Sequence, residues 1–343
     1  MIGPFRRALL AWYDASRRDL PWRRNNDFYP VWLSEIMLQQ TRVEAVIPYF
    51  DRFLARFPNT AALADAAESE VLALWSGLGY YSRARNLHRA ARSFTERGDP
   101  SRYDEILALA GIGPYTAAAI ASIALGLPHA AVDGNVLRVI SRLKNDASEI
   151  SQAAIRARFT KEAQSLLDPR RPGDFNQAMM ELGATVCLPR NPRCGECPVQ
   201  RFCEGRAAGR ERELPVKRRK DQARDIPLDL LLTTRGNEVF LIRRGAQERR
   251  LAGFWELPQK QGPIRGVKPL AKFTHRIVND RFRVTVYAAS SPPPTFREAG
   301  EWFSPERITQ TPVTTITRKA LTLIERSGRV LGKLRTPPKR SGQ

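Results

Sequence analysis

The hydrophobic residues of the first half of the chain recur at helical spacing. Apolar positions three or four residues apart run through 31–38 and 43–54. Turns that contain Pro or Gly separate such runs, as at 57–60 and 97–100. The alternation typical of strands does not interrupt this pattern, so we predict an all-helical region over residues 5–188.

In the last third of the chain the hydrophobic residues recur at every second position, the period of a β-strand. Alternating or apolar runs predict strands at 229–234, 239–242, 273–278 and 282–287. Asn279-Asp280 is expected to turn the last two strands into a hairpin, and a final helix is expected between Pro312 and about Arg326. The fold class is therefore α+β, with an all-α domain followed by a smaller α+β domain.

Two charged segments separate or follow the predicted domains. Residues 206–224 contain almost no apolar side chain, which indicates either a linker lying along phosphates or a solvated tether. The tail is rich in Lys, Arg, Pro and Gly and is predicted to be disordered. We place the domain boundaries at 1–206, 207–225 (linker), 226–327 and 328–343 (tail).

The formal net charge is +21, which favours a polyanionic partner over a protein that merely uses charge for solubility. No secretory signal opens the chain, and its longest apolar run, Thr116–Leu127, is shorter than the roughly 20 residues that span a bilayer. We therefore expect a cytoplasmic protein without a membrane partner. Nothing in the sequence demands more than a monomer.

Four cysteines stand within one short segment. Cys187, Cys194, Cys197 and Cys203 are separated by six, two and five residues. Such bunching is typical of metal sites, and four thiolates can hold either a zinc ion or a four-iron cluster.

Two acidic residues have sequence neighbours that would influence their protonation and so suit acid–base catalysis. Glu35 is flanked by Leu33, Ile36 and Met37, and burial among them would raise its pKa, although a lone glutamate on a helix is more often exposed. Asp133 precedes a helical run and suits an N-cap, where the helix dipole favours the ionised form.

Glycines mark two further candidate segments. Gly111 and Gly113 allow a tight turn whose free N–H groups, ahead of a helix, can bind a phosphate; the alternative is an ordinary turn between helices. Tyr80 follows a glycine and stands near Arg83 and Arg85, which suits a wedge between bases with phosphate contacts beside it. Core packing is the alternative for a lone tyrosine.

The cysteine spacing is similar to the cluster loop of the endonuclease III superfamily of DNA glycosylases, and 109–117 resembles its helix-hairpin-helix motif. The resemblance implies a [4Fe-4S] cluster that is not catalytic, and places the catalytic carboxylate at Asp133. Superfamily members that also cleave the strand carry a lysine where this chain has Tyr115. We therefore expect little or no lyase activity, with Tyr115 lying against the sugar or placing Asp133 and Asn135.

The segment Ser34–Thr41 resembles one branch of that superfamily, the MutY-type adenine DNA glycosylases. The resemblance implies that Glu35 protonates the departing adenine at N7 while Asp133 stabilises or captures the sugar cation. It also suggests roles in substrate and DNA binding: an adenine pocket, insertion into the duplex, and phosphate contacts. These roles fall respectively to Trp22, Arg23 and Gln177; to Gln40 and Tyr80; and to Gly111, Gly113, Arg83 and Arg85.

The last domain carries Gly253–Pro258, which looks like part of a Nudix-type fold without the metal-binding helix of the hydrolases. Phe273, Thr274 and His275 resemble the loop that recognises 8-oxoguanine in the same branch, with threonine in place of serine. This domain is therefore expected to recognise the base rather than to hydrolyse a nucleotide.

Taken together, the resemblance implies excision of adenine opposite 8-oxoguanine or guanine in duplex DNA, at the nucleoid of a bacterial cell. Two alternatives stay open. A thymine or uracil mismatch glycosylase would share Asp133, Tyr115 and the cysteines but would not need Glu35. A non-catalytic mismatch-binding protein would need neither acid.

Overall fold

The computed structural model describes residues 2–216, 224–245, 247–248, 251–260, 267–277, 279–296 and 299–327. The densest part of the expected linker, 217–220, and the expected tail from 328 lie outside these residues. The chain forms two compact units. One combines Met1–Asp65 with Asn86–Arg219, and the other combines Ala66–Arg85 with Lys220–Gln343.

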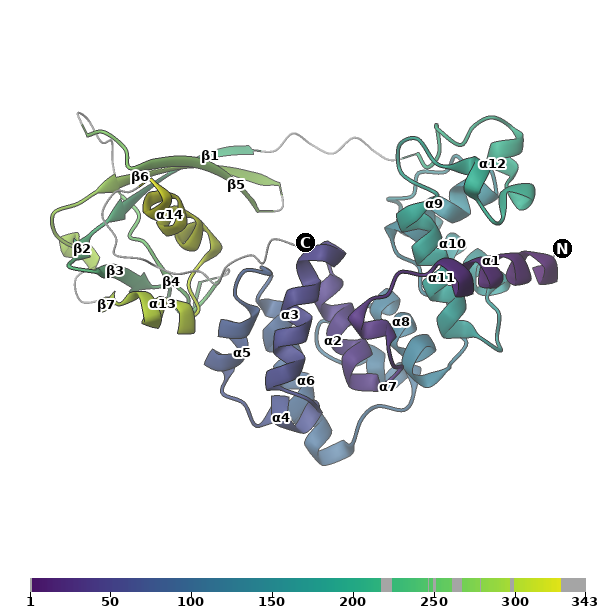
Figure 1. Cartoon of the computed structure of the whole chain (residues 1–343), viewed down its shortest axis with the longest axis horizontal. Helices are drawn as coiled ribbons and strands as arrows, with labels where there is room; N and C mark the ends of the chain where they lie inside the picture. Colours follow the sequence, from purple (N-terminus) through teal and green to yellow (C-terminus); the bar gives the residue numbers. More distant parts are fainter. Residues whose placement is uncertain are drawn as a thin grey trace. The chain divides into compact units, whose positions relative to one another are not determined.

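The first unit is helical throughout its described residues, as the apolar spacing predicts (Figure 1). Its elements are α1 (Ile2–Ser16), η1 (Pro21–Arg23), α2 (Phe28–Leu38), α3 (Val43–Arg56), α4 (Thr60–Ala64), α7 (Tyr103–Leu107), α8 (Pro114–Leu125), α9 (Gly134–Leu143), α10 (Ala153–Leu166), α11 (Pro172–Thr185), η2 (Cys194–Glu196), η3 (Gln200–Phe202) and α12 (Glu204–Ala207). Helix α6 (Ser82–Arg97) begins in the second unit and continues into the first.

Helix α11 lies at the centre of this unit because two glycines let it approach its neighbours. A Cβ at Gly173 would lie 2.7 Å from the carbonyl oxygen of Ser122 in α8, and one at Gly183 would lie 2.7 Å from the Cβ of Asn135 in α9. The buried apolar side chains of α1, α9, α10 and α11 form one core. Helix α11 is thus in backbone contact with the two helices that carry Tyr115 and Asn135.

The second unit is α+β, and its last helix ends at Arg326 as predicted. Its elements are α5 (Glu68–Trp75), β1 (Arg224–Leu232), β2 (Thr234–Arg235), β3 (Glu238–Arg243), β4 (Trp255–Glu256), β5 (Ala271–Ile277), β6 (Asp280–Ala288), η4 (Pro294–Phe296), β7 (Gly300–Phe303), α13 (Pro305–Gln310) and α14 (Thr315–Arg326). One sheet has the order β1-β6-β5, with β1 and β6 parallel; the other has β2-β3-β4, with β7 on β3. Helix α14 lies against β5 (Figure 1).

Three expectations need correction. Ile277 pairs with Asp280, so Asp280 lies in β6 and the turn is not Asn279-Asp280. The sequence pattern does not predict strands β4 and β7, because runs of two and four residues show too little alternation of apolar and polar positions. The basic segment after 206 is not wholly a tether, since Leu214 is buried and its carbonyl accepts a hydrogen bond of 2.9 Å from Arg142.

No helix in the described part of the chain is long and apolar enough to cross a membrane.

Candidate active site

A pocket of about 210 Å³ in the first unit brings together residues from segments far apart in the sequence. Its lining includes all the residues expected for catalysis and for the adenine pocket: Trp22, Arg23, Glu35, Tyr115, Asp133, Asn135 and Gln177. Arg18, Met180 and Glu181, which the sequence analysis did not single out, also line it.

Glu35 lies in α2 with only 7% of its surface exposed. Its Oε2 atom has no hydrogen-bond partner among the described residues. Burial raises the pKa of this carboxyl to about 7, with the nearby charge of Asp133 acting in the same direction; the Tyr115 hydroxyl and Arg23 oppose the shift. The rise expected from the apolar neighbours is confirmed, and a pKa of about 7 leaves the Glu35 carboxyl partly protonated at neutral pH.

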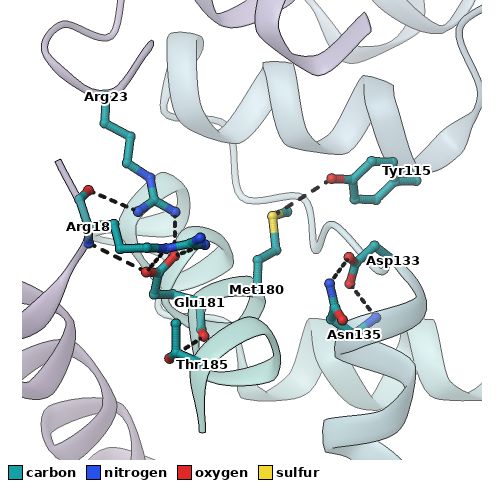
Figure 2. A network of polar contacts seen from close by, with 8 residues as sticks. All are labelled: Arg18, Arg23, Tyr115, Asp133, Asn135, Met180, Glu181 and Thr185. Atoms are coloured by element: carbon teal, nitrogen blue, oxygen red, sulfur yellow. Dashed lines mark hydrogen bonds and ion pairs between the residues drawn. The ribbon is translucent and has the colours of Figure 1, made fainter. Parts of the chain in front are cut away.

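Asp133 caps α9, as its position predicts. Its Oδ1 accepts the backbone N–H groups of Asn135 and Val136 at 2.9 and 2.7 Å. Its Oδ2 accepts the Asn135 side-chain amide at 2.8 Å, and Figure 2 shows the bonds between Asp133 and Asn135. The N–H groups of the helix terminus lower the pKa of Asp133, as expected, but they do not decide the net shift. Burial raises the pKa of Asp133, because desolvation outweighs these hydrogen bonds.

The extended segment 128–131, just before Asp133, is held along both edges by side-chain amides. Gln164 forms hydrogen bonds of 2.7 and 2.8 Å with the backbone of residues 128 and 130. Asn176 forms bonds of 2.7 and 3.0 Å with residues 129 and 131. The backbone that leads to Asp133 is therefore fixed by α10 and α11 together.

Tyr115 lies in the first turn of α8, which Gly113 caps and Pro114 begins. Its hydroxyl lies 3.8 Å from the Met180 sulfur, as Figure 2 shows, and Tyr115 lines the same pocket as Asp133. Burial and the charges of Glu35 and Asp133 raise its pKa well above the usual value, so the phenol stays neutral. Gly111, in the turn before α8, has φ +81°, and a Cβ there would lie 2.5 Å from the Asn86 side chain.

Glu181, which lines the pocket, forms ion pairs with two arginines (Figure 2). Arg18 donates to its two oxygens at 2.6 and 3.0 Å, and Arg23 donates at 2.9 Å. Burial acts to raise its pKa, but the hydrogen bonds and charges of both arginines outweigh it and lower the pKa. Glu181 stands four residues after Gln177, one turn along the same face of α11, and that spacing could have identified it from the sequence.

The four cysteines surround a second cavity of the first unit, and none forms a disulfide. Buried Arg142 donates a hydrogen bond of 3.2 Å to the Cys187 sulfur. Burial raises the pKa of Cys197 to about 11, with the other thiols adding to the shift, so these groups become thiolates only with compensating positive charge. Four sulfurs around one cavity fit an iron–sulfur cluster with one cysteine at each corner.

Helix α9 connects the two cavities. Arg138 donates a hydrogen bond of 2.9 Å to the Asn135 side-chain oxygen and one of 2.8 Å to the Cys187 carbonyl. Since Asn135 also bonds to Asp133, side chains of a single helix span the distance between the carboxylate and the cysteine loop.

The residues expected to insert into DNA are exposed. Tyr80 is 41% exposed with φ +51°, and Gln40 is exposed with φ +58°. The phosphate contacts expected of Arg83 and Arg85 are not favoured, because each is held by protein groups. Arg83 is buried and donates to the Gly79 carbonyl at 3.2 Å, while Arg85 bonds to Glu68 and to the Ala252 carbonyl.

The segment expected to recognise 8-oxoguanine lies within strand β5 rather than in a loop. Phe273 and His275 point to one face and are partly buried, whereas Thr274 is exposed on the other. Lys319 of α14 donates to the Thr274 carbonyl at 2.9 Å and lies over the Phe273 ring. Burial and the Lys319 charge lower the pKa of His275, which favours a neutral imidazole.

Two protein families match parts of the chain. Residues 33–165 match the HhH-GPD superfamily base excision DNA repair protein, and residues 187–203 match the iron–sulfur binding domain of endonuclease III. The second match confirms an iron–sulfur cofactor and removes zinc as the alternative.

Similar proteins extend these matches. An adenine DNA glycosylase of Homo sapiens is 47% identical over 225 residues, which cover 62% of this chain and 41% of that protein. One from Buchnera aphidicola (Baizongia pistaciae) is 36% identical over 259 residues, 74% of this chain and 71% of that protein. The chain thus spans less than half of the length of the human protein. Among solved structures, a thermostable thymine-DNA glycosylase is 28% identical and covers 59% of this chain and 95% of its own, with a TM-score of 0.53.

Proposed function

Because this chain belongs to the adenine DNA glycosylase family, we propose that it hydrolyses the N-glycosidic bond of adenine paired with 8-oxoguanine or guanine in duplex DNA. One observation carries the proposal: a buried glutamate whose pKa is about 7 shares a pocket with a second carboxyl. A non-catalytic mismatch-binding protein would gain nothing from this pair, since a buried acid costs stability.

The two carboxyls suit the two ends of the bond to be broken. Cleavage leaves positive charge on the sugar and negative charge on the departing base. Glu35 supplies a proton to the base, at N7, because its raised pKa keeps a large fraction of the carboxyl protonated near neutral pH. Asp133, in its ionised form, stabilises or captures the sugar cation, after which water completes hydrolysis. Tyr115 is a neutral phenol and forms no Schiff base, so strand cleavage is expected to be weak or absent.

The ion pair in the pocket fixes two arginines beside the space that the base would occupy. Glu181 is held ionised, and both of its oxygens already accept hydrogen bonds from Arg18 and Arg23, so its part is to hold these side chains rather than to contact the base. Trp22, Arg23 and Gln177 complete the adenine pocket in this proposal.

Other residues are assigned to the duplex. Tyr80 and Gln40 fill the space left by the extruded base, the turn at Gly111 and Gly113 binds a phosphate, and the Phe273–His275 strand recognises the partner base. A monomer with the predicted boundaries at 206, 225 and 327 suffices for these roles.

The test is a single-turnover assay on duplexes that carry adenine opposite 8-oxoguanine, guanine or cytosine, and thymine or uracil opposite guanine. We expect excision from the first two only, with strand breaks appearing only after alkali. Glu35→Gln should lower the rate by roughly 10²–10⁴ while the protein still binds the duplex. Release of thymine or uracil would favour the related mismatch glycosylase. Tight binding without release of any base would favour the non-catalytic protein.

A further inference from the structure

A tight turn in the second unit packs outside the core of its own sheets. Residues 251–254, here named the docking turn, follow β3 and lead into β4; Leu251 and Gly253 have φ +57° and +76°. Phe254, at its end, is fully buried. Among the described residues, the core that the two sheets share with α14 does not include Phe254, so its burial has another source.

That source is the segment Ala66–Arg85, which belongs to the same compact unit. The Phe254 ring lies 4.2 Å from that of Tyr81, centroid to centroid. Arg85 donates a hydrogen bond of 2.8 Å to the Ala252 carbonyl and lies over the Phe254 ring. Helices α5 and α13 also touch.

Tyr81 in turn organises residues 76–81, here named the wedge loop. Its hydroxyl accepts the Gly77 N–H at 3.3 Å, and Trp75 donates to the Gly79 carbonyl at 3.2 Å. Gly77 and Gly79 adopt positive φ without strain, but Tyr80 also has φ +51°, a conformation that costs a non-glycine residue free energy and persists only when surrounding contacts impose it. Tyr81 therefore joins the exposed Tyr80, its neighbour in sequence, to the docking turn.

We propose that the docking turn holds the wedge loop in the conformation that presents Tyr80, which makes Phe254 a positioning residue for insertion into DNA. The α+β region then contributes to opening the duplex as well as to recognising the partner base. The insertion role of Tyr80 rests on the proposed function, whereas the support of the loop by the turn does not.

Hydrogen exchange of the full, cluster-loaded chain without DNA tests the support itself. Phe254→Leu is compared with Phe303→Leu, because Phe303 is also fully buried in this unit but packs against Trp255 in the sheet core. We expect exchange of peptide 75–82 to rise roughly threefold to tenfold in Phe254→Leu, the size of effect that an aromatic pair confers, and to stay unchanged in Phe303→Leu. Equal exchange in wild type and Phe254→Leu, or an equal rise in both variants, would overturn the proposal.

A second measurement separates this proposal from the assigned function. With 2-aminopurine beside 8-oxoguanine in the duplex, wild-type binding should raise fluorescence as the base unstacks. Tyr80→Ala should abolish the rise, and Phe254→Leu should reduce it, with Phe303→Leu matching wild type. If Tyr80→Ala keeps the full rise, the wedge assignment fails even where the exchange result stands. If Tyr80→Ala loses the fluorescence rise while Phe254→Leu keeps it in full, the docking turn has no part in insertion.

Discussion

Glu35 and Glu181 line the same pocket and are both buried, yet their pKa values shift in opposite directions. Glu181 receives four hydrogen bonds from Arg18 and Arg23, three of them from the guanidinium groups, and together with the charges of both arginines these outweigh its desolvation. Glu35 lies among apolar side chains of α2, and the pKa of its carboxyl rises to about 7. The comparison teaches that partners, not burial, decide which of two neighbouring acids is an anion and which is a proton donor.

Removing the two arginine partners of Glu181 should have the largest effect on the protein, seen as a loss of stability. The double variant Arg18→Met, Arg23→Met leaves a buried carboxylate without its cations, which typically costs about 3–5 kcal/mol of folding free energy. Urea unfolding at pH 8 measures this loss. Arg24→Met is the matched control, since Arg24 pairs with Asp19 at the exposed surface. A double variant as stable as the control would show that the arginines do not stabilise the anion.

The stability of wild type relative to Glu35→Gln should fall as the pH rises, whereas its stability relative to Glu181→Gln should not. The pKa of Glu35 is raised on folding, so its contribution is complete below about 4.5 and is lost as pH rises through about 7. The shift corresponds to about 3 kcal/mol at most. Unfolding at pH 5 and pH 8 should therefore show wild type losing stability relative to Glu35→Gln. Glu181→Gln should instead be destabilised at pH 8, because the pKa of Glu181 is lowered. Parallel pH curves for wild type and Glu35→Gln would refute the raised pKa.

The excision rate should report the same titration. In its proposed role as the proton donor, Glu35 should make the single-turnover rate fall about tenfold per pH unit above pH 7, reaching roughly 100-fold at pH 9. The affinity for the duplex is measured at each pH and the enzyme is kept in excess of the dissociation constant, so that weaker binding at alkaline pH does not lower the measured rate. A rate that stays constant to pH 9 would exclude Glu35 as the acid.

Asn176→Ala should have the smallest effect. It removes two hydrogen bonds from the segment before Asp133, so the carboxylate loses alignment while the adenine pocket stays intact. We expect the excision rate to fall about tenfold at unchanged duplex affinity. Gln164→Ala, on the other edge of the segment, should resemble it. A loss of affinity without a loss of rate would contradict the positioning role.

Much of the fold follows from local patterns. The 3.6-residue period marks the helices of the first unit, and Asp133 ahead of an apolar helix predicts its N-cap. The Glu35 segment and the cysteine spacing are contiguous, so the sequence alone identifies them. The pairing of Arg18 with Glu181 joins residues 163 positions apart, and no local pattern encodes such a contact.

The net pKa shift of Asp133 and the contacts of Arg83 and Arg85 also differ from the expectations, and both depend on tertiary packing. The pKa of Asp133 depends on how far tertiary packing removes water, which outweighed the favourable helix terminus. Arg83 and Arg85 were expected to face phosphates, but nearby carbonyl groups and rings of the fold hold them. Sequence reveals which groups are present, and packing decides where they point.

The Oε2 atom of Glu35 lacks a hydrogen-bond partner in the described chain, and under the proposed function this makes substrate binding depend on the acidity of the solution. An adenine that offers a ring nitrogen to this atom stabilises the protonated carboxyl. Above neutral pH the complex would therefore take up a proton as it forms. The heat of binding should then vary with the ionisation enthalpy of the buffer, and the duplex should bind more weakly as the solution becomes alkaline.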